Sequence, residues 1–184
     1  MSGLSLKNCS QCKRLVKSRT QVVKPIITSK NPAVLIVSDY PSVLDDAEGV
    51  PMFRGGPETA GFWHHKFIGN LGVEKSHATI YTVQCKPETK PKLDEVKNCS
   101  IWINYLLSQF KFRLVILYGE LPSRLILDFK KPTINYAGKF FISEKLDGLK
   151  CFVTYHPRML AENRDEYLDR FKRHTKLIKN YLYN

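Results

Sequence analysis

The sequence of 184 residues lacks long apolar runs, internal repeats and low-complexity segments. None of its apolar runs approaches the roughly 20 residues that a membrane helix needs, and its first residues lack the apolar core of a signal peptide. We therefore expect no membrane partner, and a cytoplasmic protein, or a nuclear one if the source is eukaryotic or viral. A hydrophobic content of 43% and a charged content of 25% indicate one folded domain over residues 1–184 that is monomeric.

Acidic side chains are scarce, with 17 Asp and Glu against 29 Lys and Arg, which gives a net charge of +12. Residues 1–30 form a basic N-terminal arm with seven basic residues and no acidic one, and a second basic concentration begins at about Met159. Such an excess favours a polyanionic partner, because Lys and Arg release counterions when they contact phosphates. A basic surface that serves solubility alone remains the alternative.

Cysteines are few, and five thiols in a reducing compartment do not indicate a disulfide framework. Cys9 and Cys12 form a C-x-x-C pair, whereas Cys85 follows a strand-like run and Cys99 falls within a helical pattern. Four such thiols can converge on a tetrahedral zinc or a four-iron cluster. A redox-active C-x-x-C pair with unrelated further thiols is the alternative. Cys151, in an apolar strand, fits a buried core residue.

Strand-like and helix-like segments alternate along the chain, which predicts an α/β protein with a short, mainly parallel central sheet covered by helices on both faces. The expected strands are 33–38, 77–84, 112–118 and 151–155, and the expected helices are 57–72, 92–110, 121–129 and a long terminal helix from about 159. Because His64 and His65 are neighbours on a helix, they cannot both face one metal, and we expect them at the surface or in helix packing.

Two polar segments follow strands that should end at the same edge of this sheet. The first is the acidic loop that begins at Asp39 and contains Asp45 and Asp46. The second begins with His156 and Pro157, where proline cannot continue the strand ladder. Ligands bind at the carboxyl edge of open α/β sheets, so a carboxylate and an imidazole could face one cleft. A solvated loop and a structural histidine are the alternatives.

Together these segments resemble the uracil-DNA glycosylase superfamily, and specifically its iron-sulfur family 4, over nearly the whole chain. The similar segments, in order, are CSQCKRLVKSRTQVV, SDYPSVLDDAEGVPMF, YTVQCKP and TYHPRML, with the fourth cysteine in the helix between the last two. The resemblance implies a three-layer α/β/α sandwich that hydrolyses the N-glycosidic bond of uracil, or of a related modified pyrimidine, flipped out of single- or double-stranded DNA.

The resemblance also implies a ligand set and site residues. A [4Fe-4S] cluster, with zinc as the alternative, would be bound by Cys9, Cys12, Cys85 and Cys99. The implied catalytic residues are Asp39, Asp45 and His156. The implied substrate-binding residues are Tyr40, Phe53 (or Met52 in its place) and Tyr81. The implied DNA-binding residues are Arg158, Met159 and Leu160, the last two as an apolar wedge in the base stack.

The chain departs from the family pattern at positions near the expected base. Ser38 and Ser42 replace glycines, and Tyr40 replaces an alanine. Tyr81 stands where the family usually has an asparagine that contacts the edge of uracil, and a phenol cannot supply both the donor and the acceptor of an amide. These departures motivate an alternative hypothesis: a glycosylase-fold DNA-binding protein with impaired catalysis, acting in replication or repair.

Overall fold

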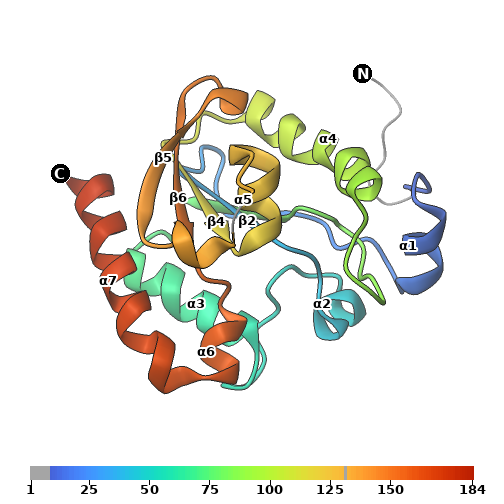
Figure 1. Ribbon diagram of the computed structural model, residues 1–184, viewed down its shortest axis with the longest axis horizontal. Helices are drawn as coiled ribbons and strands as arrows, with labels where there is room; N and C mark the ends of the chain where they lie inside the picture. Colours follow the sequence, from blue (N-terminus) through green and yellow to red (C-terminus); the bar gives the residue numbers. More distant parts are fainter. Residues whose placement is uncertain (1–8, 131) are drawn as a thin grey trace.

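The computed structural model describes residues 9–130 and 132–184, which form a six-stranded sheet with helices on both of its faces (Figure 1). The strands lie in the order β1-β3-β2-β4-β6-β5. Their bounds are β1 Ile26–Ile27, β2 Val34–Ser38, β3 His77–Tyr81, β4 Leu114–Tyr118, β5 Lys139–Ser143 and β6 Leu149–Thr154. The four inner strands are parallel, and the two edge strands pair antiparallel to their neighbours.

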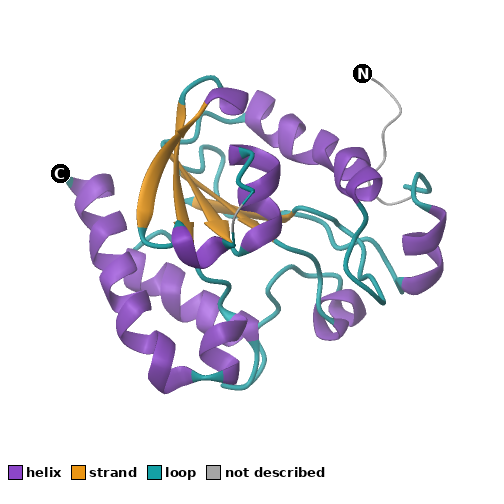
Figure 2. Ribbon diagram, viewed as in Figure 1, coloured by secondary structure: helices purple, strands orange, loops and turns teal. Residues whose placement is uncertain are grey.

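Seven α-helices and two short 3-10 helices connect these strands within the described residues (Figure 2). The α-helices are α1 Lys13–Ser18, α2 Val43–Glu48, α3 Ala60–Leu71, α4 Leu93–Gln109, α5 Glu120–Leu127, α6 Arg158–Glu162 and α7 Arg164–Tyr183. The 3-10 helices are η2 Thr133–Asn135 and η3 Glu144–Leu146. No helix in the described part of the chain is at once long and apolar enough to span a membrane.

The sheet is buried on both faces, as a parallel sheet must be. All five residues of β2 and of β4 are buried. Side chains of α3, α6 and α7 pack on one face of the sheet, with Ile36 and Phe152 among the strand residues beneath them. Those of α4 and α5 pack on the other face, over Leu35 and Val153. The predicted three-layer α/β/α sandwich is therefore confirmed (Figure 1).

Several element bounds differ from those predicted, for local reasons. The acidic segment after β2 is not all loop, because Ser42 begins α2 with a capping box in which Ser42 and Asp45 exchange hydrogen bonds. The predicted terminal helix is interrupted at Asn163, whose side chain accepts a hydrogen bond from the Glu166 N–H and so begins α7. His64 is buried against the sheet, in agreement with a role in helix packing.

Candidate active site

The carboxyl ends of β2 and β6 bring an acid and an imidazole to one edge of the sheet. Asp39 directly follows β2, and His156 lies two residues beyond the end of β6. The two strands are not neighbours, because β4 lies between them. The Nε2 atom of His156 is nevertheless 3.0 Å from the Oγ atom of Ser38, the last residue of β2. The sheet thus places the two predicted functional groups on the same side of the molecule.

Asp39 is buried, with 6% of its surface exposed, and its side-chain contacts come from α5, from α6 and from the turn that precedes α5. Oδ1 accepts a hydrogen bond of 3.1 Å from the Leu121 N–H in the first turn of α5. The guanidinium of Arg158 lies 3.8 Å from Oδ2. Burial raises the pKa of Asp39 to about 6, although the charge of Arg158 opposes this shift. The carboxylate is therefore anionic above about pH 6 and has limited access to water.

Gly119 leaves the space that the Asp39 carboxylate occupies. Its φ is +88°, in the region that favours glycine, and a Cβ at this position would lie 3.0 Å from Oδ2. A larger residue after β4 would push the carboxylate away from the N–H of Leu121. The backbone turn between β4 and α5 therefore helps to fix the position of the acid that follows β2.

His156 is a neutral hydrogen-bond donor held in one orientation. Its Nδ1 accepts a hydrogen bond of 3.1 Å from the backbone N–H of Arg158. Since Nδ1 is an acceptor, the proton of the neutral imidazole belongs on Nε2, which then donates to Ser38 Oγ. Burial, assisted by the charge of Arg158, lowers the pKa of His156 to about 3. The ring consequently stays neutral at physiological pH and presents an N–H at the sheet edge.

Asp45 and Tyr81, both predicted at the site, are saturated by contacts within the protein. Asp45 accepts hydrogen bonds from the N–H and hydroxyl of Ser42, from the Phe53 N–H and from the Tyr81 hydroxyl. The same hydroxyl accepts from the Met52 N–H at 3.0 Å. Burial raises the pKa of Tyr81 well above its usual value, with the Asp45 charge adding to the effect. This network fixes the segment after α2 and leaves neither polar group free for a ligand.

Of the two residues predicted to stack on a base, Phe53 is the accessible one. Met52 is 1% exposed and has a φ of +54°, whereas Phe53 is half-buried. The backbone of Phe53 packs against the start of α3, where a Cβ on Gly61 would lie 1.8 Å from the Phe53 carbonyl oxygen. Only glycine fits at position 61, so this contact positions the segment that carries the phenyl ring.

The remaining predicted contacts of the site differ in exposure. Tyr40 is half-buried and packs against the small apolar cluster that includes Leu121. In α6, the side chain of Arg158 is 47% exposed and Met159 is half-buried. Leu160 is 4% exposed and belongs to the core under α3 and α7. Because the core holds Leu160, the predicted wedge is reduced to Met159 in this conformation.

The family model described as the uracil DNA glycosylase superfamily matches residues 25–182. The chain belongs to this superfamily. It is also 27% identical to a type-5 uracil-DNA glycosylase from Pyrobaculum aerophilum over 186 aligned positions, which cover 86% of this chain and 81% of the relative. The resemblance found in the sequence is thus confirmed for the superfamily, although the relative is named type 5 and the sequence motifs suggested family 4.

Four cysteines gather at one end of this superfamily member. Cys85 and Cys99 are buried in a small apolar cluster, with Cys9 and Cys12 packed against it, whereas Cys151 lies apart in β6. The match to the superfamily begins at residue 25, so of these four cysteines it includes only Cys85 and Cys99. Among residues 9–130 and 132–184, no group of three or more His, Cys, Asp or Glu side chains is arranged to hold a metal ion.

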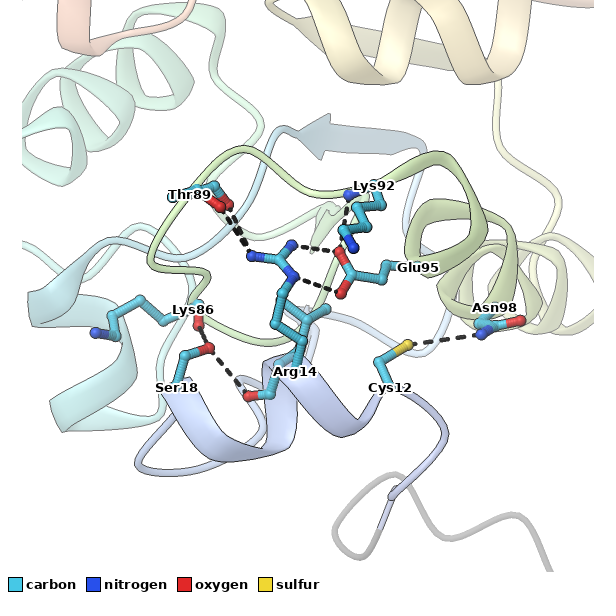
Figure 3. Close-up of polar contacts among 9 residues, drawn as sticks. Cys12, Arg14, Ser18, Lys86, Thr89, Lys92, Glu95 and Asn98 are labelled. Atoms are coloured by element: carbon cyan, nitrogen blue, oxygen red, sulfur yellow. Dashed lines mark hydrogen bonds and ion pairs between the residues drawn. The ribbon is translucent and has the colours of Figure 1, made fainter.

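The N–H donors around these thiols nevertheless suit a metal centre that is bound through sulfur. The guanidinium of Arg19 donates to Cys85 Sγ at 2.9 Å, and the Asn98 amide lies 3.6 Å from Cys12 Sγ (Figure 3). N–H donors near sulfur are the contacts that tune iron-sulfur clusters. Burial raises the pKa of Cys12 and raises that of Cys99 to about 12. Reactive redox thiols are typically ones whose pKa is lowered.

The contacts that hold the first described segment in place were not predicted from the sequence. Arg14 of α1 pairs with Glu95 of α4 through a hydrogen bond of 2.9 Å and also contacts the Thr89 hydroxyl (Figure 3). The buried carboxylate of Asp46 accepts from the Thr20 N–H at 2.7 Å. In the sequence, the only sign of this contact was that Asp46 has no basic residue close to it. Its role is to attach the basic arm to α2.

Proposed function

We propose that this protein is a DNA glycosylase that hydrolyses the N-glycosidic bond of uracil, or of a related modified pyrimidine, flipped out of DNA. The observation that supports the proposal most is the joint position of Asp39 and His156 at the carboxyl edge of the sheet, with Nε2 of His156 at 3.0 Å from Ser38 Oγ. Membership of the uracil DNA glycosylase superfamily gives this geometry its chemical context.

In the proposed reaction, the bond between the sugar C1′ and the base nitrogen breaks and its electron pair leaves with the base. Water adds to C1′ and loses a proton, and the departing base anion takes up a proton, so the products are the free base and an abasic site. The Asp39 carboxylate would orient this water and stabilise the positive charge that develops on the sugar. Its burial makes such an interaction stronger than it would be in water. Asp45 would support the reaction indirectly, by fixing the segment that carries Phe53.

His156 would stabilise the negative charge that develops on the leaving base. Its Nε2–H now donates to Ser38 Oγ, and a carbonyl oxygen of the base would take the place of that hydroxyl as the acceptor. Because the ring is already neutral and oriented by the Arg158 N–H, it needs no change of protonation. The Phe53 ring would stack on the flipped base, with Tyr40 beside it.

Base specificity is the part of the function that this site defines least. Tyr81 cannot act as an asparagine would, because its hydroxyl is already used by Asp45 and by the Met52 N–H. We therefore propose that Tyr81 limits the shape of the pocket rather than pairing with the edge of the base. Arg158 and Met159 would contact the DNA beside the flipped nucleotide, Arg158 at a phosphate and Met159 at the base stack.

We further propose that Cys9, Cys12, Cys85 and Cys99 hold a [4Fe-4S] cluster, with zinc as the alternative ligand of the same thiols. When bound, the cluster would join the basic arm to α4 and to the segment after β3, a structural role with no part in the reaction. The alternatives differ in colour, since an iron-sulfur protein absorbs at about 400 nm and a zinc protein does not.

The decisive assay measures free base released from oligonucleotides that carry uracil, hypoxanthine, or mismatched or 5-substituted pyrimidines. We expect release from at least one of them, and a loss of at least about a hundredfold in rate for His156→Ala. Salt-sensitive DNA binding without any base release, in protein with its full metal content, would instead support the alternative of a non-catalytic DNA-binding protein. Tyr40 and Tyr81 are the residues that favour that alternative.

A further inference from the structure

A cavity of about 340 Å³ lies next to the end of β6, and Asp39 and His156 of the candidate active site do not line it. It is lined by Ala137, Gly138, Tyr155, Arg170, Arg173, His174 and Leu177. Tyr155 directly precedes His156 in the chain, and the Cα atoms of consecutive residues are about 3.8 Å apart. The cavity therefore lies beside the same sheet edge at which the candidate active site is found.

His174 contributes an imidazole whose free edge lines the cavity. The residue is only 6% exposed, and its Nδ1 is 2.8 Å from the hydroxyl of Thr154. Within the described residues, Nε2 makes no hydrogen bond. Burial lowers the pKa of His174 to about 4, so the ring is neutral at pH 7. In the tautomer in which Nδ1 accepts from the Thr154 hydroxyl, Nε2 carries the proton and can donate it to a ligand.

Gly138 keeps this edge of the imidazole open. Its φ is +83°, and a Cβ at this position would lie 2.7 Å from the Nε2 atom of His174. Any other residue would be strained in this conformation and would also fill the space in front of the nitrogen. A glycine here thus preserves room for a ligand atom within hydrogen-bonding distance of a buried donor.

Two guanidinium groups make the cavity electropositive. Arg170 donates to the Tyr155 hydroxyl at 3.2 Å and is partly neutralised by Glu166, whose carboxylate is 3.5 Å away. Arg173 is exposed and pairs with no acidic side chain in the described chain. Arginine groups and a neutral N–H donor around one cavity match the oxygen atoms of a phosphate, which accept several hydrogen bonds at once.

We propose that this cavity binds a backbone phosphate of the DNA strand, with Arg173 and the Nε2–H of His174 as its main donors. The identity of the ligand as DNA rests on the proposed function, whereas the phosphate chemistry rests on the cavity alone. A phosphate held beside Tyr155 would anchor the strand next to the nucleotide that enters the active site. The basic residues of the last helix would then bind DNA, a role that the sequence analysis did not distinguish from solubility.

The test compares Arg173→Gln with Lys179→Gln, which removes the same charge from α7 but faces the groove beside Asn70 instead. Binding is measured by fluorescence anisotropy on a duplex without any modified base, over a range of salt concentrations. We expect Arg173→Gln to lower the affinity roughly tenfold at about 0.1 M salt and to reduce the salt slope by about one. Lys179→Gln should lower it less than about twofold.

Single methylphosphonate substitutions then locate the contact, because each removes the charge of one phosphate. At one position the difference between wild type and Arg173→Gln should disappear, and Arg173→Lys should retain most of the salt slope. Equal effects of the Arg173 and Lys179 variants, or no such position, would overturn the proposal. So would tight binding of inorganic phosphate, weakened by Arg173→Gln, without any change in DNA affinity. Because no assay here requires base release, a failed glycosylase assay leaves this test intact.

Discussion

The Nε2–H of His156 donates to the hydroxyl of Ser38 across the end of β4, over a distance of 3.0 Å. The bond joins the ends of two strands that do not pair with each other. Under the proposed function, this bond would hold the imidazole in the orientation that a base carbonyl meets, and it would supply an acceptor until a base arrives. Ser38 would then both position the donor and compete with the substrate for it.

Ser38→Ala separates these two effects. The variant leaves a buried N–H without a partner, so we expect the free energy of unfolding to fall by about 1–3 kcal/mol. Base release should be retained or increased at saturating substrate, because no hydroxyl competes for the proton. Urea denaturation and single-turnover base release measure the two quantities. A loss of activity as large as that of His156→Ala would show that the hydroxyl itself takes part in the reaction.

The rate of base release should depend on the ionisation of one acid. Since burial raises the pKa of Asp39 to about 6, we expect the single-turnover rate to rise with pH through a midpoint of about 6. His156, with a pKa of about 3, should add no second transition between pH 5 and 8. A profile that is flat across this range, or one that falls above pH 6, would contradict the assignment of Asp39.

Asp39→Asn should lower the rate of base release and raise the stability of the protein at pH 8. The folded pKa of about 6 lies above the unfolded value of about 3.9, so the native state holds an extra proton between these values. Stability is then lost as pH rises through this window, and the variant should regain up to about 2 kcal/mol at pH 8 but little at pH 4. Denaturation at both pH values measures the difference, and base release should fall at least about a hundredfold.

Acid should destabilise the protein through its histidines. Burial lowers the pKa of all five, most strongly for His64, His156 and His174. Unfolded histidines bind protons at about pH 6.5, so stability is full above that value and declines as pH falls below it. We expect a loss of several kcal/mol between pH 7 and pH 4.5, which exceeds the opposing effect of Asp39. Constant urea midpoints over this range would disagree with the burial of these rings.

The cysteines offer a matched pair of variants. Cys85→Ala should lower the yield of folded protein and abolish absorbance at about 400 nm together with bound iron. Cys151→Ala, which removes an equally buried thiol from β6, should keep both the colour and the iron. If Cys85→Ala remains fully stable and active, the structural role of the cluster is wrong. Zinc instead of iron in the wild-type protein would identify the other metal.

The order of the four inner strands and of the longer helices was predictable because it depends on local patterns, whereas the short edge strands β1 and β5 and the short helices α1 and α2 were not predicted. The run 34–37 is apolar throughout, as a strand buried on both faces must be, and the helical segments repeat their apolar residues every three or four positions. The bounds were less predictable. The last helical segment is divided at Asn163, whose side chain caps the N-terminus of α7. The helical pattern of the sequence is otherwise continuous there, so this single cap was not predicted.

The sequence by itself determined the fold class, the resemblance to the superfamily, and the residues that are candidates for functional roles. Only the tertiary structure decided which of them are free to act. Tyr81 is satisfied by Asp45, 36 residues away, while Asp39 contacts Leu121 at a separation of 82 and His156 contacts Ser38 at a separation of 118. Hydrogen bonding and burial at such separations depend on how the chain folds back on itself, and they set the pKa values and orientations on which the chemistry depends.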